Sequence, residues 1–171
     1  MPASRPPIED GSAMRDVVRR IISGGQTGAD RAALDVAIAL GIEHSGWVPR
    51  GRWAEDGPLA PQYQVREASS SHLADRTELN VRDSDATLIL SHGPLTGGSA
   101  LTLFLAQERG KPVLHLDLVK HDEPSATRLA TVWILEVRPA VLNVAGPRAS
   151  IDPLIYEAVS RVLRRIFEWA H

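Results

Sequence analysis

The stretch Ile22-Ser-Gly-Gly-Gln-Thr-Gly-Ala-Asp-Arg31 connects a short apolar run to a segment rich in alanine. Upstream, residues 17–23 (VVRRIIS) are largely β-branched, which is typical of a strand that ends at a turn. Downstream, residues 29–40 (ADRAALDVAIAL) are good helix formers with apolar positions along one stripe, and Gly41 follows as a helix cap. The stretch therefore predicts a strand, a glycine turn and a helix.

The same pattern recurs along the rest of the chain. Residues 86–90 (ATLIL) form a continuous apolar run of the kind that parallel sheets bury on both faces, and the glycine loop SHGPLTGGSA follows them. Further strands are expected at residues 42–48, 113–116 and 141–144, with a strand or an extended edge at 63–68. Further helices are expected at residues 72–84, 101–108, 124–137 and 151–169. This alternation predicts an α/β fold, in which a doubly wound, mostly parallel sheet carries helices on both faces.

The size and composition of the chain predict one domain. Its 171 residues with 43% hydrophobic content are enough for one sizeable core, which we assign to residues 16–171. Residues 1–15, rich in Pro, Gly and charge, are expected to form a disordered tail. A formal net charge of -2 argues against a general nucleic-acid binder. The lack of cysteine, and apolar runs too short for a membrane span, predict a cytoplasmic protein that binds no membrane.

Two glycine loops lie where a ligand is expected in this fold class. In open α/β sheets ligands bind outside the carboxyl ends of the strands, and both loops occupy such ends. Their glycines let backbone amides approach an anion, and each loop leads to a helix N-terminus, where the helix dipole favours negative charge. We therefore expect a phosphate or another small anionic ligand to be bound by Gly24, Gly25, Gln26, Thr27 and Gly28 in the first loop and by Thr96, Gly97, Gly98 and Ser99 in the second.

Neither loop has the spacing of a known nucleotide fingerprint. GGQTGAD lacks the Lys-Ser/Thr of a P-loop and differs from G-x-G-x-x-G, so a nucleoside triphosphatase and an ordinary NAD enzyme are disfavoured. A plain turn between strand and helix is the alternative for either loop taken alone. Asp30, Arg50 and Arg76 are further candidates for ligand contacts, and each also has a purely structural interpretation. The histidines show no metal-ligand spacing, so no metal site is expected.

Several blocks of the sequence resemble the molybdenum cofactor carrier proteins. They are GGQTGADRAALDVAIALGI, GWVPRGRWAEDGPL, RTELNVRDSDATLIL, LTGGSALTLFLAQERGKPVLHLDL and LNVAGPR, which together run from about Arg20 to the terminal helix. The resemblance implies a single Rossmann-like domain, similar in fold to the lysine-decarboxylase-like, LONELY GUY-type nucleotide enzymes. It also implies that the chain binds and protects or delivers molybdenum cofactor (molybdopterin), a pterin with a dithiolene and a terminal phosphate, with molybdoenzymes as recipients.

The nucleotide enzymes differ from this chain at one informative position. Their motif P-G-G-x-G-T-x-x-E ends in a catalytic Glu, and the matching residues 96–104 keep Gly97 and Gly98 but have Phe104 in place of the acid. Because N-glycoside cleavage needs a proton donor or a carboxylate, we expect a non-catalytic carrier. The alternatives are a nucleotide or nucleoside-monophosphate hydrolase and a nucleotide-sensing module of the same fold.

The terminal helix predicts self-association. Its apolar residues lie around more than one face, so that they can both cover the sheet and join protomers; they are Ile155, Val159, Val162, Leu163, Ile166 and Phe167. We therefore expect a homo-dimer or a homo-tetramer.

Overall fold

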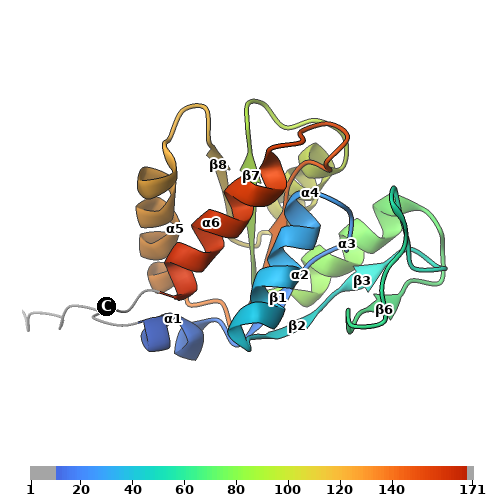
Figure 1. Cartoon of the computed structure of the whole chain (residues 1–171), viewed down its shortest axis with the longest axis horizontal. Helices are drawn as coiled ribbons and strands as arrows, with labels where there is room; N and C mark the ends of the chain where they lie inside the picture. The colour runs from blue at the N-terminus through green and yellow to red at the C-terminus, as the bar shows by residue number, and fades with distance from the viewer. Residues whose placement is uncertain (1–10, 169–171) are drawn as a thin grey trace, which may run out of the picture.

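Five parallel strands form the central sheet of the structure, a computed structural model that describes residues 11–168 (Figure 1). They are β1 (Arg20–Ile22), β2 (Glu43–Ser45), β7 (Ala86–Ser91), β8 (Val113–Asp117) and β9 (Val141–Ala145). Their order is β2-β1-β9-β7-β8, and each neighbouring pair is parallel. The strand that comes last in the chain, β9, is therefore the central one.

Helices cover both faces of this sheet (Figure 1). One layer holds α1 (Gly11–Val17), α2 (Ala29–Leu40), α5 (Glu123–Val137) and α6 (Ile155–Phe167), in which α6 packs against the other three. The second layer holds α3 (Leu73–Asp83) and α4 (Gly97–Glu108), which pack against each other. The expected fold, a single doubly wound, Rossmann-like α/β domain, is confirmed.

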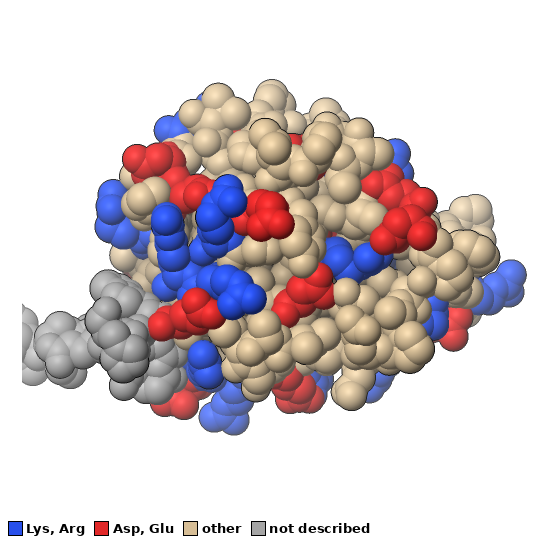
Figure 2. Space-filling view, in the orientation of Figure 1, with Lys and Arg blue, Asp and Glu red and all other residues tan. Residues whose placement is uncertain are grey.

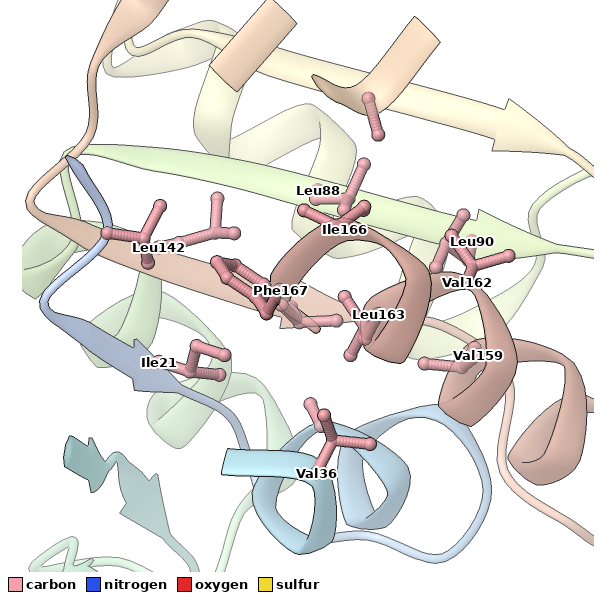
Figure 3. Close-up of a cluster of buried hydrophobic side chains, with 14 of the residues drawn as sticks. Ile21, Val36, Leu88, Leu90, Leu142, Val159, Val162, Leu163, Ile166 and Phe167 are labelled. Atoms are coloured by element: carbon pink, nitrogen blue, oxygen red, sulfur yellow. The ribbon is translucent and has the colours of Figure 1, made fainter. Parts of the chain in front are cut away.

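The main core lies between the sheet and α6 (Figure 3). Ile21 of β1, Leu88 and Leu90 of β7 and Leu142 of β9 meet the apolar stripe of α6 there. All six apolar residues that the sequence analysis names in this helix are buried within the chain. The helix therefore covers the sheet as expected, but the prediction that these residues also join protomers is wrong.

The disordered tail predicted over residues 1–15 is wrong for residues 11–15. These residues belong to α1, whose Met14 is 1% exposed because it packs in the main core. The helix continues to Val17, so β1 begins at Arg20 and not at the predicted residue 17. Residues 1–10, the rest of the predicted tail, lie outside the described residues.

The single strand predicted at residues 42–48 is two strands. β2 ends at Ser45, and β3 (Trp47–Val48) begins after Gly46. At Gly46 the backbone has φ of 140° and passes so close to Ser23 that a Cβ would lie 2.0 Å from the Ser23 carbonyl oxygen. The chain turns there because only glycine fits, and β3 leaves the main sheet.

Two small sheets lie beside the main one. β3 pairs in parallel with β6 (Arg66–Glu67), which falls within the segment predicted as a strand or an extended edge. Between β3 and β6, β4 (Trp53–Ala54) and β5 (Gly57–Pro58) form a short antiparallel hairpin. The tip of this hairpin hydrogen-bonds to the first glycine loop.

The second glycine loop is part of a helix. The sequence places the start of that helix at Leu101, but α4 begins at Gly97. Gly97, Gly98 and Ser99 are therefore the first turn of α4 rather than a loop ahead of it. The opposite shift occurs at α6, which begins at Ile155 instead of residue 151, and whose predicted end at residue 169 lies outside the described residues.

The surface carries charges of both signs. Over the face that bears α5 and α6, Lys and Arg side chains lie beside Asp and Glu side chains (Figure 2). None of the helices within residues 11–168 is long and apolar enough to cross a membrane.

Candidate functional site

A pocket of about 320 Å³ lies at the carboxyl ends of β1 and β9, where the two glycine loops come together. Gly24 follows β1, and Asn143 to Ala145 are the last residues of β9. The first turn of α4 forms a second wall, the beginning of α3 a third, and the segment between β9 and α6 a fourth. The pocket has the position and the size of a small-molecule site in an open α/β sheet.

The predicted site residues fall into two groups. Those that line the pocket are Gly24, Gln26, Asp30, Arg76, Thr96, Gly97, Gly98 and Ser99. Those that do not line it are Gly25, Thr27, Gly28 and Arg50. The space beside Gly25 is filled by Leu59 and Val48, and the space beside Gly28 by the backbone of Pro147 and its neighbours, so these two glycines serve packing within the protein.

Gly24 makes room for an ion pair inside the pocket. Arg76 Nη1 donates to Asp30 Oδ2 at 3.1 Å, and the two side chains are only 12% and 8% exposed. A Cβ on residue 24 would lie 1.4 Å from Arg76 Nη1, so the guanidinium occupies the space that a side chain would take. Arg76 thus lies against the first loop and also lines the pocket that both loops share.

The Asp30 carboxylate and the Arg76 guanidinium differ in how many of their hydrogen-bonding atoms already have a partner. Burial raises the pKa of the Asp30 carboxyl above its ordinary value, and the adjacent Arg76 opposes that shift. The backbone amide of Gln26 donates to the same carboxylate oxygen, Asp30 Oδ2, at 3.4 Å. Arg76 Nε has no hydrogen-bond partner among the described residues. Asp30 is therefore occupied by the protein's own donors, whereas Arg76 has one buried donor that is left without an acceptor in the described chain.

The amides of the first loop are largely used within the chain. The Gln26 side-chain oxygen accepts from the amides of Thr27 at 3.0 Å and Glu55 at 2.9 Å. The amide of Ala29, at the start of α2, donates to the carbonyl oxygen of Pro147 at 3.1 Å. This loop therefore has fewer free donors for an anion than its sequence suggests.

Glu55, at the tip of the β4–β5 hairpin, holds two walls of the pocket together. It accepts from the Thr27 hydroxyl, and from the amide and hydroxyl of Ser150 at 3.0 and 2.6 Å. Arg148 lies 3.6 Å away as an ion-pair partner. The hydrogen bonds from Ser150 and Thr27 hold the pKa of the Glu55 carboxyl below its ordinary value. The hairpin thus fixes the first glycine loop to the segment that follows β9.

The first turn of α4 is open by contrast. Thr96 is its N-cap residue, but no side chain caps the helix. Among the described residues, no acceptor is bonded to the amides of Gly97, Gly98 or Ser99. No acidic residue lies in this turn. These free donors, together with the helix dipole, make the turn attractive to an anion in the pocket.

Several lining residues were missed by the sequence analysis. Asn143 is 3% exposed at the pocket floor, and its only side-chain hydrogen bond within the described part of the chain runs from Nδ2 to Thr87 Oγ1 at 3.3 Å. Arg148 lines the opposite wall, and Leu73, Leu101 and Ile151 supply apolar surface. Asn143 has a sequence signal, because it is the polar residue in the middle of an otherwise apolar strand.

Two residues singled out from the sequence lie away from the pocket. Arg50 is exposed, and its backbone amide donates to Ser70. Phe104 is 55% exposed on α4 and does not line the pocket. A Glu at residue 104 would therefore lie outside this pocket, so the substitution alone carries no argument about catalysis in it.

The charged residues that line the pocket are Arg76, Arg148 and Asp30, of which Arg76 and Asp30 form an ion pair and Arg148 has Glu55 as its partner. Residues 11–168 hold no group of three or more His, Asp or Glu side chains that could bind a metal ion. The site as built is a pocket with one open helix N-terminus, two guanidinium groups and apolar sides.

Comparison with known proteins shows what this chain is similar to. Residues 21–167 match the Circularly permutated YpsA SLOG family. The chain is similar to the crystal structure of a "Putative molybdenum carrier protein" from Syntrophus aciditrophicus SB, with 52% identity, a TM-score of 0.86, and 88% of this chain and 95% of that chain covered. A second solved structure, (E)-4-hydroxy-3-methyl-but-2-enyl diphosphate reductase, aligns at 12% identity with a TM-score of 0.38 over 91% of this chain and 62% of that chain, too low to support any argument. No curated protein sequence matches the chain.

Proposed function

This chain belongs to the Circularly permutated YpsA SLOG family, and from that premise we propose that it is a cytoplasmic carrier of molybdenum cofactor. In this proposal the pocket binds the phosphate-bearing pterin, and the protein protects it or delivers it to molybdoenzymes without catalysing a reaction. The observation that carries the proposal is the open N-terminus of α4 in the pocket. The similarity to the molybdenum carrier protein from S. aciditrophicus supports a molybdenum-related role.

The terminal phosphate of the cofactor is assigned to the first turn of α4. The amides of Gly97, Gly98 and Ser99 are free to donate to phosphate oxygens, and the dipole of the twelve-residue helix favours the negative charge. A Cβ on Gly98 would meet no atom within 4 Å, so the space in front of this turn is open. Arg76 and Arg148 supply positive charge on two other walls, with guanidinium groups that suit phosphate.

The ring system of the pterin is assigned to the rest of the pocket. Leu73, Leu101 and Ile151 provide apolar surface against which a flat ring can pack. Asn143 is buried, lines the same pocket and has a side-chain amide that can both donate to and accept from ring nitrogens and oxygens. A pocket that has both polar groups and apolar side chains suits a ligand that has a phosphate and a heterocycle.

Carriage rather than hydrolysis is favoured by the carboxylates of the pocket. Asp30 is the one acidic residue among the described residues that line it, and Asp30 is already bonded to Arg76. General acid–base cleavage of a glycosidic bond commonly uses two carboxyl groups, one on each side of the bond. A pocket with a single, occupied carboxylate is better suited to holding a ligand than to cleaving it.

The proposal is tested by purifying the protein from a host that makes the cofactor and measuring bound molybdenum and pterin fluorescence. We expect both in the wild type. Gly98→Asp adds a negative charge where the phosphate is assigned, and is expected to reduce bound cofactor about tenfold or more. Gln107→Asp adds the same charge near the other end of α4 and is the matched control.

Two results would contradict this proposal in different ways. A wild-type protein that carries neither molybdenum nor pterin rejects the carrier function. A Gly98→Asp protein that carries as much cofactor as the Gln107→Asp protein leaves carriage intact and rejects the assignment of the phosphate to α4.

A second candidate is a nucleoside-monophosphate hydrolase, favoured by the raised pKa of Asp30 beside Arg76 in a pocket. It predicts release of free base from nucleoside monophosphates, detected by chromatography, and loss of that release in Asp30→Asn. Base release no faster than in a protein-free blank eliminates it. Tight nucleotide binding with neither base release nor pterin would instead point to a nucleotide-sensing module.

A further inference from the structure

The main sheet has two edge strands, β2 and β8, and the outer edge of β8 lies beside a groove. β8 is the last strand in the sheet order, so its backbone groups on that side pair with no other strand of the sheet. Its neighbour β7 is buried along its whole length, whereas in β8 only Leu116 is fully buried. Unprotected edge strands tend to pair with another chain. This edge therefore has the backbone geometry for a partner.

A groove of about 700 Å³ runs between this edge and α5, which lies at the left side of the molecule in Figure 1. Leu114, His115 and Leu116 of β8 form one side of it. The other side is a stripe of α5, which we call the α5 stripe: Ser125, Arg128, Leu129, Val132, Trp133 and Glu136. These residues recur at spacings of three and four, so they share one face of the helix.

The middle of the α5 stripe is apolar and open to solvent. Leu129 is 44% exposed and Val132 is 55% exposed, and Trp133 beside them is half-buried. Leu129 and Val132 are large apolar side chains that are exposed in the described chain and lie beside the β8 edge. Burying them against a partner would remove apolar surface from water.

The two ends of the α5 stripe carry opposite charges. Arg128 and Glu136 are both exposed and lie four residues on either side of Val132. Arg128 donates to the Ser125 hydroxyl at 3.1 Å, and neither Arg128 nor Glu136 forms an ion pair with any residue of the described chain. If the stripe is turned by 180° about an axis at Val132, its positive end lies opposite its negative end. The stripe is thus complementary in charge to a second copy of itself.

We propose that two copies of this chain pair through the β8 edge and the α5 stripe about a two-fold axis. A two-fold contact joins the same patch on both protomers and makes neighbouring elements antiparallel, as β8 edges require to form a continuous sheet. Arg128 then faces the partner's Glu136, and the Val132 side chains meet at the axis. The surface is separate from the ligand pocket, so the proposal does not depend on the proposed function. It also replaces α6, whose apolar residues are buried, as the self-association surface.

The test is sedimentation velocity of the full chain over a range of concentrations, with circular dichroism to check the fold. The wild type is expected to be a dimer. Arg128→Glu places like charges at both ends of the interface, as does Glu136→Arg, and each is expected to weaken the dimer at least tenfold. The double variant restores opposite charges and is expected to recover the dimer. Arg165→Glu, an exposed charge reversal on α6, is the control and is expected to behave as the wild type.

Three results would overturn this inference. They are a wild type that stays monomeric at every concentration, a dimer that neither single reversal weakens, and a double variant that remains as weak as the single ones. A peptide or another protein as the natural occupant of the groove would give the first of these results.

Discussion

The loop after β1 and the first turn of α4 both bring glycines to one pocket, but for opposite reasons. In the first loop, the Arg76 guanidinium occupies the space beside Gly24. The backbone amides of Thr27 and Ala29 donate to the Gln26 side chain and to the Pro147 carbonyl oxygen. In α4, a Cβ on Gly98 would meet no atom within 4 Å, and the amides around it have no partner within the described chain. One glycine-rich segment is filled by the protein, and the other is open to a ligand.

This difference assigns separate roles to two segments that look equivalent in sequence. The first loop fixes the ion pair of Asp30 and Arg76 and the hydrogen bonds of Glu55, so it determines the shape and charge of the pocket. The first turn of α4 has no such contacts, and in our proposal it binds the anionic end of the ligand. Substitutions in the two segments should therefore separate stability from binding.

The largest expected effect is that of Gly24→Ala on stability. The added Cβ takes the place of Arg76 Nη1 and removes the guanidinium from the nearly buried Asp30 carboxylate. Breaking a buried ion pair while both charges stay costs about 3 kcal/mol in the free energy of unfolding, measured by urea denaturation. Gly98→Ala is the matched control, and because Ala is the better helix former it is expected to raise the free energy of unfolding, by about 1 kcal/mol or less. Equal losses in the two variants would contradict the distinction between a filled and an open segment.

A smaller effect on stability is expected from Glu55→Gln, which tests the hairpin that supports the first loop. The loss of charge weakens the hydrogen bonds from Thr27 and Ser150, at a cost of about 1 kcal/mol in the free energy of unfolding at pH 7. Glu108→Gln, at the far end of α4, is the control.

The pH dependence of the Glu55→Gln effect follows from the lowered pKa. A carboxyl whose pKa is lower in the folded state stabilises the fold above its unfolded value, here 4.5, and loses that contribution as the pH falls towards the folded value. The difference between the wild type and Glu55→Gln should therefore shrink below pH 4.5. A difference that is constant from pH 7 to pH 3 would indicate that the Glu55 charge has no role.

The smallest expected effect is that of inorganic phosphate on thermal unfolding. Phosphate bound at α4 stabilises the folded state by RT ln(1 + [L]/Kd), about 0.4 kcal/mol when its concentration equals Kd. The melting temperature of the wild type should rise with phosphate at constant ionic strength, and that of Gly98→Asp should not. An equal rise in both proteins would place the anion elsewhere on the surface.

The sequence predicts the layered fold well because the pattern that defines it is local. The predicted bounds of α2, α3, α5, β7, β8 and β9 agree with the structure to within one residue. Two errors have a common physical cause, which is contact with distant parts of the chain. Helix α1 forms where Met14 packs in the main core, and the strand at residues 42–48 breaks where Gly46 passes the backbone of Ser23.

The location of the candidate site can be predicted from the sequence, but the different roles of its two glycine segments cannot. Glycines at strand ends place both segments at the pocket, and Arg76, a candidate from the sequence, lies there as well. Whether an amide is free depends on acceptors such as the Pro147 carbonyl, which lies far along the sequence. The roles of Glu55 and Arg148 likewise depend on contacts between segments that no local pattern encodes.

The central position of β9 has a consequence for the order in which this protein is assembled. β1 and β7 are joined in the sheet only through β9, which comes after both in the chain. While the ribosome has released only the residues before 141, the β1–β2 and β7–β8 pairs can form as separate halves, and the edges of β1 and β7 that later pair with β9 are still open. Completing the sheet then requires inserting one five-residue strand between them. Asn143, Val144 and Ala145 of the same strand line the pocket. A nascent chain therefore completes its continuous sheet and its candidate binding site in a single late step.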